Sequence, residues 1–184
     1  YERLNTESQD VTRQLFLRLI SLGEGTEDTR RRALRSELSS IAGDQAAMDS
    51  VMEIYGKYRL LAFDREPNTR EPTVEIAHEA LISKWGRLRT WVEDSRDDLR
   101  AQRQLAQATQ EWIGNNRDDS FLATGVRLGQ FEDIMERGSI ALNLDEITYI
   151  QASIHLRTKE QRRRNIAIGV LAVFSLIATV AALF

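Results

Sequence analysis

TVEIAHEALISKWGRLRTW, residues 73–91, places a predicted strand directly before a predicted helix, with His78 at the change between them. Val74 and Ile76 favour an extended backbone, so residues 73–77 are predicted to form the strand. Apolar residues at three- and four-residue spacing then indicate a helix. They are Leu81, Trp85, Leu88 and Val92. Because the first backbone N–H groups of a helix lack intrahelical partners, this junction either holds an anion or is a well-packed corner.

The residues before this stretch are predicted to form short helices and strands. In order, they are a helix from Ser8 or Asp10 to Leu22, a short strand or extended link over 29–34, helices over 36–41 and 44–57, a strand over 59–63, a polar loop over 64–72 and the strand over 73–77. This order is that of a winged-helix domain, in which the loop between Pro67 and Pro72 is the wing. A two-stranded hairpin alone is marginally stable in water, so we expect it to lie on the preceding helices.

DNA binding is a common role of winged helices, and the helix over 44–57 is the candidate recognition helix. Its charged residues are Asp44, Asp49, Glu53 and Lys57. A helix in the major groove needs side chains that donate to bases and phosphates, whereas this helix would repel the phosphates. The chain also has a net charge of only -3. We therefore expect no nucleic-acid partner, and we interpret the basic run over 30–32 as a solvated edge.

The residues after the helix that contains Trp91 are predicted to form an antiparallel helical bundle within residues 78–156. The predicted apolar faces consist of Leu99, Leu105, Ala106, Thr109, Trp112 and Ile113; of Phe121, Leu128, Phe131 and Met135; and of Ile147, Ile150 and Ile154. Burial of these faces, rather than helix propensity, is expected to hold the bundle together. Trp85, Trp91 and Trp112 are expected to be its largest buried side chains.

The C-terminal residues 166–184 contain no charged residue and are almost wholly apolar. As a helix they would be roughly 28 Å long, close to the thickness of the hydrocarbon core. The basic segment over 157–164 precedes them, and the positive-inside rule places it and the N-terminal side in the cytoplasm. We therefore predict a single-pass transmembrane helix over 165–184, in contact with the lipid bilayer, and a location on the cytoplasmic face of the membrane. The alternative is a hydrophobic helix buried in a larger assembly.

Motifs for catalysis and metal binding are absent from the sequence. His78 and Glu79 begin like the zinc motif H-E-x-x-H, but position 82 is isoleucine. Gly56-Lys57 resembles the end of a P-loop, but Val51 stands where its first glycine belongs. We expect neither a metal site nor an enzyme in this chain alone. Because the chain begins at Tyr1 and ends inside an apolar run, we expect it to be part of a longer polypeptide.

The run IAHEALISKWGRLRTWVEDSRDDLRAQRQL, residues 76–105, resembles the segment that follows the NTPase core in bacterial STAND-type signalling ATPases (AP-ATPase/NACHT-like, novel STAND). RDDSFL at 117–122 and GVRL at 125–128 are also similar to that family. The resemblance implies a mainly α fold: a winged helix with a small β-hairpin, an antiparallel helical bundle and a C-terminal hydrophobic helix. In many such proteins a WD-repeat or other sensor domain follows.

The resemblance also implies a role for His78. The wider family carries a Met-His-Asp motif in its winged helix, whose histidine contacts the β-phosphate of ADP and holds the closed, inactive form. Ala77-His78-Glu79 matches this motif in position, with alanine in place of methionine. His78 is therefore the candidate sensor of the β-phosphate, and Glu79 the candidate supporting residue. A helix N-terminus favours an anion and keeps the imidazole neutral, so the imidazole N–H can donate. The alternative, in which His78 only caps the helix or contacts a loop, stays open.

The organisation implied by the resemblance is a regulatory module. It comprises a winged helix over 1–77 with its last helix continuing to about 93, a helical arm over 78–156, a basic juxtamembrane segment over 157–164 and the hydrophobic helix. The module would close over ADP bound by an upstream P-loop ATPase domain, which would hold ADP or ATP with Mg. It would relay a signal from a downstream sensor domain and form a homo-oligomer on activation. The alternatives are a membrane-anchored winged-helix DNA-binding regulator and a purely structural helical spacer.

Overall fold

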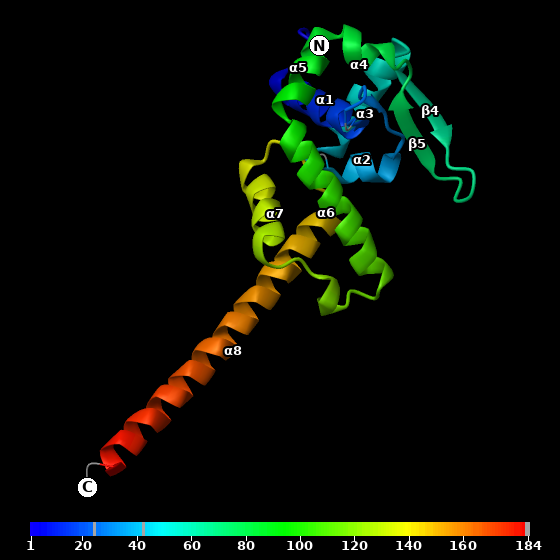
Figure 1. The fold of residues 1–184 in the computed structure, drawn as a ribbon. Helices are drawn as coiled ribbons and strands as arrows, with labels where there is room; N and C mark the ends of the chain where they lie inside the picture. The colour runs from blue at the N-terminus through cyan, green and yellow to red at the C-terminus, as the bar shows by residue number, and fades with distance from the viewer. Residues whose placement is uncertain (24, 42, 183–184) are drawn as a thin grey trace.

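The computed structural model describes residues 1–182 apart from Glu24 and Ala42, and it describes side chains up to Ala172. The described chain is mainly helical and contains two small antiparallel sheets (Figure 1), which confirms the prediction of a mainly α chain. The elements, in order, are α1 (Thr6–Arg18), β1 (Ile20–Ser21), β2 (Thr29–Arg30), β3 (Ala33–Leu34), α2 (Arg35–Ile41), α3 (Gln45–Lys57), β4 (Leu61–Arg65), β5 (Pro72–Ile76), α4 (Ala80–Lys84), α5 (Gly86–Asp94), α6 (Arg96–Gly114), the 3-10 helix η1 (Asp119–Phe121), α7 (Gly125–Arg137) and α8 (Leu144–Ala182).

The first helix begins and ends earlier than the sequence predicted. Asn5, not Ser8 or Asp10, caps α1, and its side chain accepts a hydrogen bond from the Ser8 backbone N–H at 2.8 Å. The helix stops at Arg18 because the next residues pair with β2, in the register Ile20 to Arg30. This strand pairing outweighs the continued apolar spacing, which on its own predicted helix as far as Leu22.

Helix α3 lies where the sequence predicted a helix over 44–57, and Asp44 is its N-cap. The Asp44 side chain accepts a hydrogen bond from the Ala46 backbone N–H at 2.8 Å. The buried side chains of α3 are Met48, Val51, Met52 and Tyr55, whereas Tyr58 directly after the helix is 71% exposed.

The second sheet has three strands in the order β3-β5-β4, all antiparallel, so β5 is the central strand. Val74 of β5 lies opposite Ala33 on one side and Phe63 on the other. The predicted hairpin is thus present as β4 and β5, and it packs on α2 and α3 (Figure 1). The short strand β3 completes the sheet, and Val74 and Ile76 are buried against the helices.

The predicted single helix after β5 is two helices. The break lies at Trp85, whose ψ of 97° is extended rather than helical, and α5 begins at Gly86. Trp85 packs edge-on against Phe16 and Trp91, with ring centroids 5.1 Å and 5.5 Å away. Spacing alone predicted a continuous helix, because apolar residues recur across the break at helical intervals.

Two hydrophobic cores lie along the molecule. The first core is built by α1 to α5 and the two sheets, and it is joined by Leu99 at the start of α6 and Ile140 between α7 and α8. The second core is built by α7, α8 and the later part of α6, from Leu105 onward. Trp85 and Trp91 pack against the first core, and Trp112 lies in the second. The expectation that all three tryptophans fill one bundle is therefore wrong for two of them.

Helices α6, α7 and α8 pack on one another, and we call this group of three helices the bundle. The buried residues of α7 are Leu128, Phe131 and Ile134, whereas Met135 is 36% exposed. On α8 the buried apolar residues are Tyr149 and Ile150. The Tyr149 hydroxyl donates to the Phe121 carbonyl at 2.9 Å, so the polar group of this buried side chain has a hydrogen-bond partner.

Helix α8 leaves the bundle and extends far from the rest of the molecule (Figure 1). Within the residues that the structure describes, no helix is long and apolar enough to cross a membrane. In the same helix, the charged segment over 157–164 lies just before the apolar residues that begin at Ile166. A described stretch long enough to cross a membrane would therefore have to include these charged residues. The predicted single-pass membrane location is therefore wrong for this part of the chain. Residues 173–184 of the predicted span lie outside the described side chains.

Candidate functional site

His78 lies in the connection between β5 and α4 and is exposed. Its backbone carbonyl accepts a hydrogen bond from the Leu81 N–H at 2.9 Å. Its imidazole forms no hydrogen bond or ion pair with any other residue that the structure describes. The side chain of His78 is therefore available to a group from outside the described chain.

Glu79 follows His78 in the sequence, but its side chain makes contacts on a different part of the surface. One of its carboxylate oxygens accepts a hydrogen bond from the Arg30 backbone N–H at 3.4 Å. Glu79 also lines a cleft of about 490 Å³, together with Asp28 and Arg96. Arg96 donates two hydrogen bonds to Asp28, at 2.6 and 3.2 Å, which fixes one wall of the cleft. The lining residues do not include His78, so the two candidate site residues face different surroundings.

The helix that follows His78 is shorter than predicted. Helix α4 has five residues and begins at Ala80, without a side-chain cap. A helix of little more than one turn aligns few peptide dipoles, so it adds little attraction for an anion. The exposed imidazole of His78, rather than the helix N-terminus, is therefore the feature of this corner that is open to an outside group.

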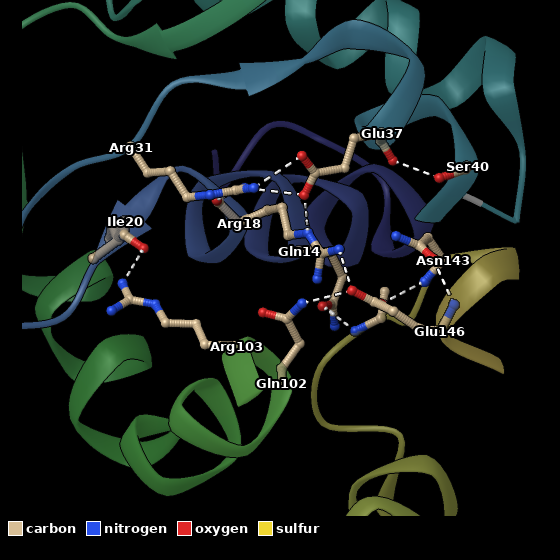
Figure 2. A network of polar contacts seen from close by, with 11 residues as sticks. Gln14, Arg18, Ile20, Arg31, Glu37, Ser40, Gln102, Arg103, Asn143 and Glu146 are labelled. Carbon is tan, nitrogen blue, oxygen red and sulfur yellow. Dashed lines mark hydrogen bonds and ion pairs between the residues drawn. The ribbon is translucent and has the colours of Figure 1, made fainter. Parts of the chain in front are cut away.

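A partly buried cluster of charged and polar side chains lies where the two cores meet; we call it the polar junction (Figure 2). It consists of Arg18, Arg31, Glu37, Gln102 and Glu146. Arg18 donates from Nε to Glu37 at 2.6 Å and from Nη2 to Glu146 at 2.7 Å. Arg31 donates two hydrogen bonds to Glu37, both at 3.0 Å. The Arg18 and Glu146 side chains are only 4% and 1% exposed, so this ion pair is buried.

Glu146 connects three helices at the polar junction. Its Oε1 accepts from Arg18 of α1 and, at 2.8 Å, from the Gln102 amide of α6. Its Oε2 accepts from the Asn143 backbone N–H at 2.9 Å, while the Asn143 side chain accepts from the Glu146 N–H at 2.8 Å. This reciprocal pair is a capping box at the N-terminus of α8. Glu146, in the first turn of α8, therefore also binds α1 and α6 (Figure 2).

Further polar contacts join α1 to the α7–α8 connection. Arg13 donates to the Ser139 carbonyl at 2.9 Å, and the Gln14 side chain accepts from the Ala141 N–H at 2.8 Å. Ser139 also donates from its hydroxyl to Asp98 of α6. The connection between α7 and α8 is thus attached to α1 and α6 by hydrogen bonds, and Ile140 within it is also buried in the first core.

The sequence interpretation did not single out the polar junction, because its members lie far apart along the chain. Arg18 and Glu146 are 128 residues apart. Two local signals were available. The spacing Asn143-x-x-Glu146 is that of a capping box, and Gln102 interrupts the apolar face of α6 between Leu99 and Leu105.

Acid is expected to weaken the polar junction through Glu37. Burial, the largest influence, raises the pKa of Glu37, but hydrogen bonds and charges from Arg31 and Arg18 outweigh it, so the pKa lies below its ordinary value of 4.5. A carboxyl with a lowered folded-state pKa stabilises the fold above its unfolded pKa, and this stability disappears as the pH falls through the folded pKa. We expect the Tm difference between the wild type and Glu37→Gln to be constant above about pH 6 and to shrink below about pH 4. Thermal unfolding at a series of pH values measures it, and a difference that does not change with pH contradicts it.

Comparison with known protein families assigns residues 1–120 to a STAND NTPase-related region. The matching family is Novel STAND NTPase 1, and the chain belongs to it. The resemblance inferred from residues 76–105 is thereby confirmed. The match includes the first core apart from Ile140 and Ala141, the His78 corner and α6. No curated protein and no solved structure matches the chain.

Proposed function

We propose that this chain is the regulatory part of a STAND signal-transduction ATPase. In this proposal it closes over ADP bound by an upstream P-loop ATPase domain, which holds ADP or ATP with Mg, and relays a signal from a downstream sensor domain. Membership of the Novel STAND NTPase 1 family supports the proposal. The observation that carries it is the exposed His78 imidazole directly after the central strand β5, without a partner among the described residues.

We further propose that α1 to β5 form a winged helix. The order α1, β3, α2, α3, β4, β5 and the sheet order β3-β5-β4 support this assignment. The wing is then the turn between β4 and β5, which the Glu66 N–H closes by donating to the Glu71 carbonyl at 2.8 Å. The exposed side of α3 carries Glu53, and Asp49 on that helix pairs with Arg35, so this surface does not favour DNA. The proposed contact with nucleotide is therefore made by the corner after β5, not by α3.

The chemistry proposed for His78 is a hydrogen bond to phosphate. A neutral imidazole has one N–H donor, and a phosphate oxygen accepts it as a charge-assisted hydrogen bond. Glu79 has a supporting role, because its contact with the Arg30 N–H ties the corner to β2. A nucleotide switches the protein only if it binds two states with different affinity. The proposed difference is that His78 contacts the β-phosphate in the closed state alone.

His78→Ala in the intact protein is expected to weaken ADP retention and to raise basal activity. Loss of one hydrogen bond to a charged group corresponds to roughly 10- to 100-fold faster ADP release. The measurement is the release rate of a fluorescent ADP analogue, together with the amount of nucleotide that remains after gel filtration.

The matched control is His155→Ala, because His155 is the other histidine of the chain and lies exposed on α8. This variant is expected to retain ADP as the wild type does. A folded His78→Ala protein with unchanged bound nucleotide and unchanged activity would show that the sensing role is wrong. The chain would then be better described as a structural helical spacer.

A further inference from the structure

The border between the two cores can be followed along a single helix. On the buried side of α6, Leu99 belongs to the first core and Leu105 to the second. The buried residue between them is Gln102, which is 6% exposed and polar. A helix that crossed one continuous core would be expected to carry an apolar residue at this position. The two cores are therefore separated by a polar layer.

The polar junction fills this layer. Gln102 donates to Glu146, Glu146 accepts from Arg18, and Arg18 also binds Glu37. Arg13 and Gln14 add the polar contacts to the α7–α8 connection described above. Ile140 is buried in the first core, and Ala141 packs against it. The hydrogen bonds from Arg13 and Gln14 therefore lie beside a small apolar contribution of the α7–α8 connection to the first core.

A buried ion pair is a poor choice for a permanent contact. Replacing such a pair by apolar side chains of similar volume is often neutral or stabilising, so the pair adds specificity more than stability. Charged groups also regain hydration when they separate, whereas apolar faces resist exposure to water. A cleft of about 640 Å³, lined by Arg18, Glu37 and Glu146 among others, gives water a route to these groups.

Helix α8 is placed to act on this contact. Glu146 lies in its first turn, and the capping box with Asn143 fixes the Glu146 side chain to the helix N-terminus. The rest of α8 extends from the bundle as one continuous helix (Figure 1). A continuous helix transmits a tilt along its length, so displacement of its distal part moves Glu146 relative to Arg18.

We propose that the Arg18–Glu146 ion pair is a releasable contact at which the bundle (α6, α7 and α8) tilts relative to the N-terminal unit (α1 to α5). Leu99 at the start of α6 and Ile140 before α8 stay in the first core during this tilt. Tilting of α8 breaks the pair, water enters the polar junction, and the two cores stay folded. Restoration of the pair returns the bundle to the arrangement in the structure. The proposal does not depend on nucleotide sensing by His78.

Pairs of spin labels test this motion directly. The chain contains no cysteine, so Ser50→Cys on α3 and Gln151→Cys on α8, both exposed positions, provide two unique labelling sites. Pulsed EPR then measures the distance between the N-terminal unit and the bundle. We expect one dominant distance in the otherwise wild-type protein. Glu146→Gln, which removes the charge and keeps the size, is expected to raise a second distance population at least threefold.

Two further variants serve as controls. Arg18→Met combined with Glu146→Met replaces the ion pair by apolar contact, so a single distance is expected. Asp97→Asn breaks the exposed ion pair with Arg100 on α6, so it is expected to leave the distances unchanged. Arg18→Lys is the second test variant. Arginine binds the two carboxylates from two different nitrogens of a planar group, whereas a lysine has a single ammonium nitrogen and lacks this geometry.

The outcomes separate motion from unfolding. A larger second population in Glu146→Gln or Arg18→Lys, with the helical circular dichroism retained, supports the proposal. An unchanged distance distribution in both folded variants overturns it. If both variants unfold the two cores in one transition, the polar junction is part of one cooperative structure, and the proposal is also overturned.

Discussion

Arg18→Ala is expected to lower the free energy of unfolding by about 3–5 kcal/mol. Arg18 is 5% exposed and binds two carboxylates, those of Glu37 and Glu146. Glu37 keeps its two hydrogen bonds from Arg31. Glu146, however, remains buried and loses the one ion pair that it forms within the described part of the chain. The cost is therefore the desolvation of an unpaired charge, rather than the net strength of the pair. Chemical denaturation followed by far-UV circular dichroism measures the change.

Two comparisons identify the cause of this loss. Arg35→Ala removes an ion pair with Asp49 whose members are 50% and 40% exposed, and it is expected to cost at most about 1 kcal/mol. Arg18→Met combined with Glu146→Met removes both charges, and this double variant is expected to be as stable as the wild type or more so. If Arg18→Ala costs no more than Arg35→Ala, the polar junction does not behave as a buried ion pair.

Elements that depend on neighbouring residues can be predicted from local signals. Asp44 caps α3 because a short carboxylate reaches the free N–H groups two or three residues ahead, whatever the rest of the chain does. Gly138 ends α7 because its φ of 62° is left-handed, and glycine adopts this conformation without strain. The β4–β5 hairpin likewise follows from two β-rich runs on either side of a polar turn.

Features that depend on distant residues could not be predicted. The break at Trp85 interrupts a pattern with helical spacing, because its ring packs on Phe16, which belongs to α1. The polar junction assembles from α1, α2, α6, α8 and the segment before α2. No local spacing could reveal which distant arginine meets Glu146. The position of His78 was predicted, but the five-residue length of the helix after it depends on the same packing of Trp85.

The C-terminal prediction shows how context changes the meaning of an apolar run. Uncharged residues and a basic flank together indicated a span and a juxtamembrane segment. In the described structure, Arg162, Arg163 and Arg164 belong to the same continuous helix as Ile166 and Leu171. Hydropathy along the sequence records only the composition of a stretch. Hydropathy does not show that charged and apolar residues belong to one continuous helix. It also does not show that the first turn of this helix forms a buried ion pair.

Phe16→Ala is expected to destabilise the first core by about 3–5 kcal/mol and to loosen the His78 corner. The Phe16 ring is fully buried and packs edge-on against Tyr55 and Trp85, each at a centroid distance of 5.1 Å. Its removal leaves a cavity beside Trp85, whose extended backbone separates α4 from α5. The control Phe63→Ala, at a ring that is 54% exposed, is expected to cost less than half as much. Denaturation measures both losses, and hydrogen exchange at Leu81 and Ile82 reports on the corner. Two results would contradict the view that Phe16 holds the helix break at Trp85 and thereby the position of His78. One is an equal loss of stability in both variants, and the other is unchanged hydrogen exchange at Leu81 and Ile82 in Phe16→Ala.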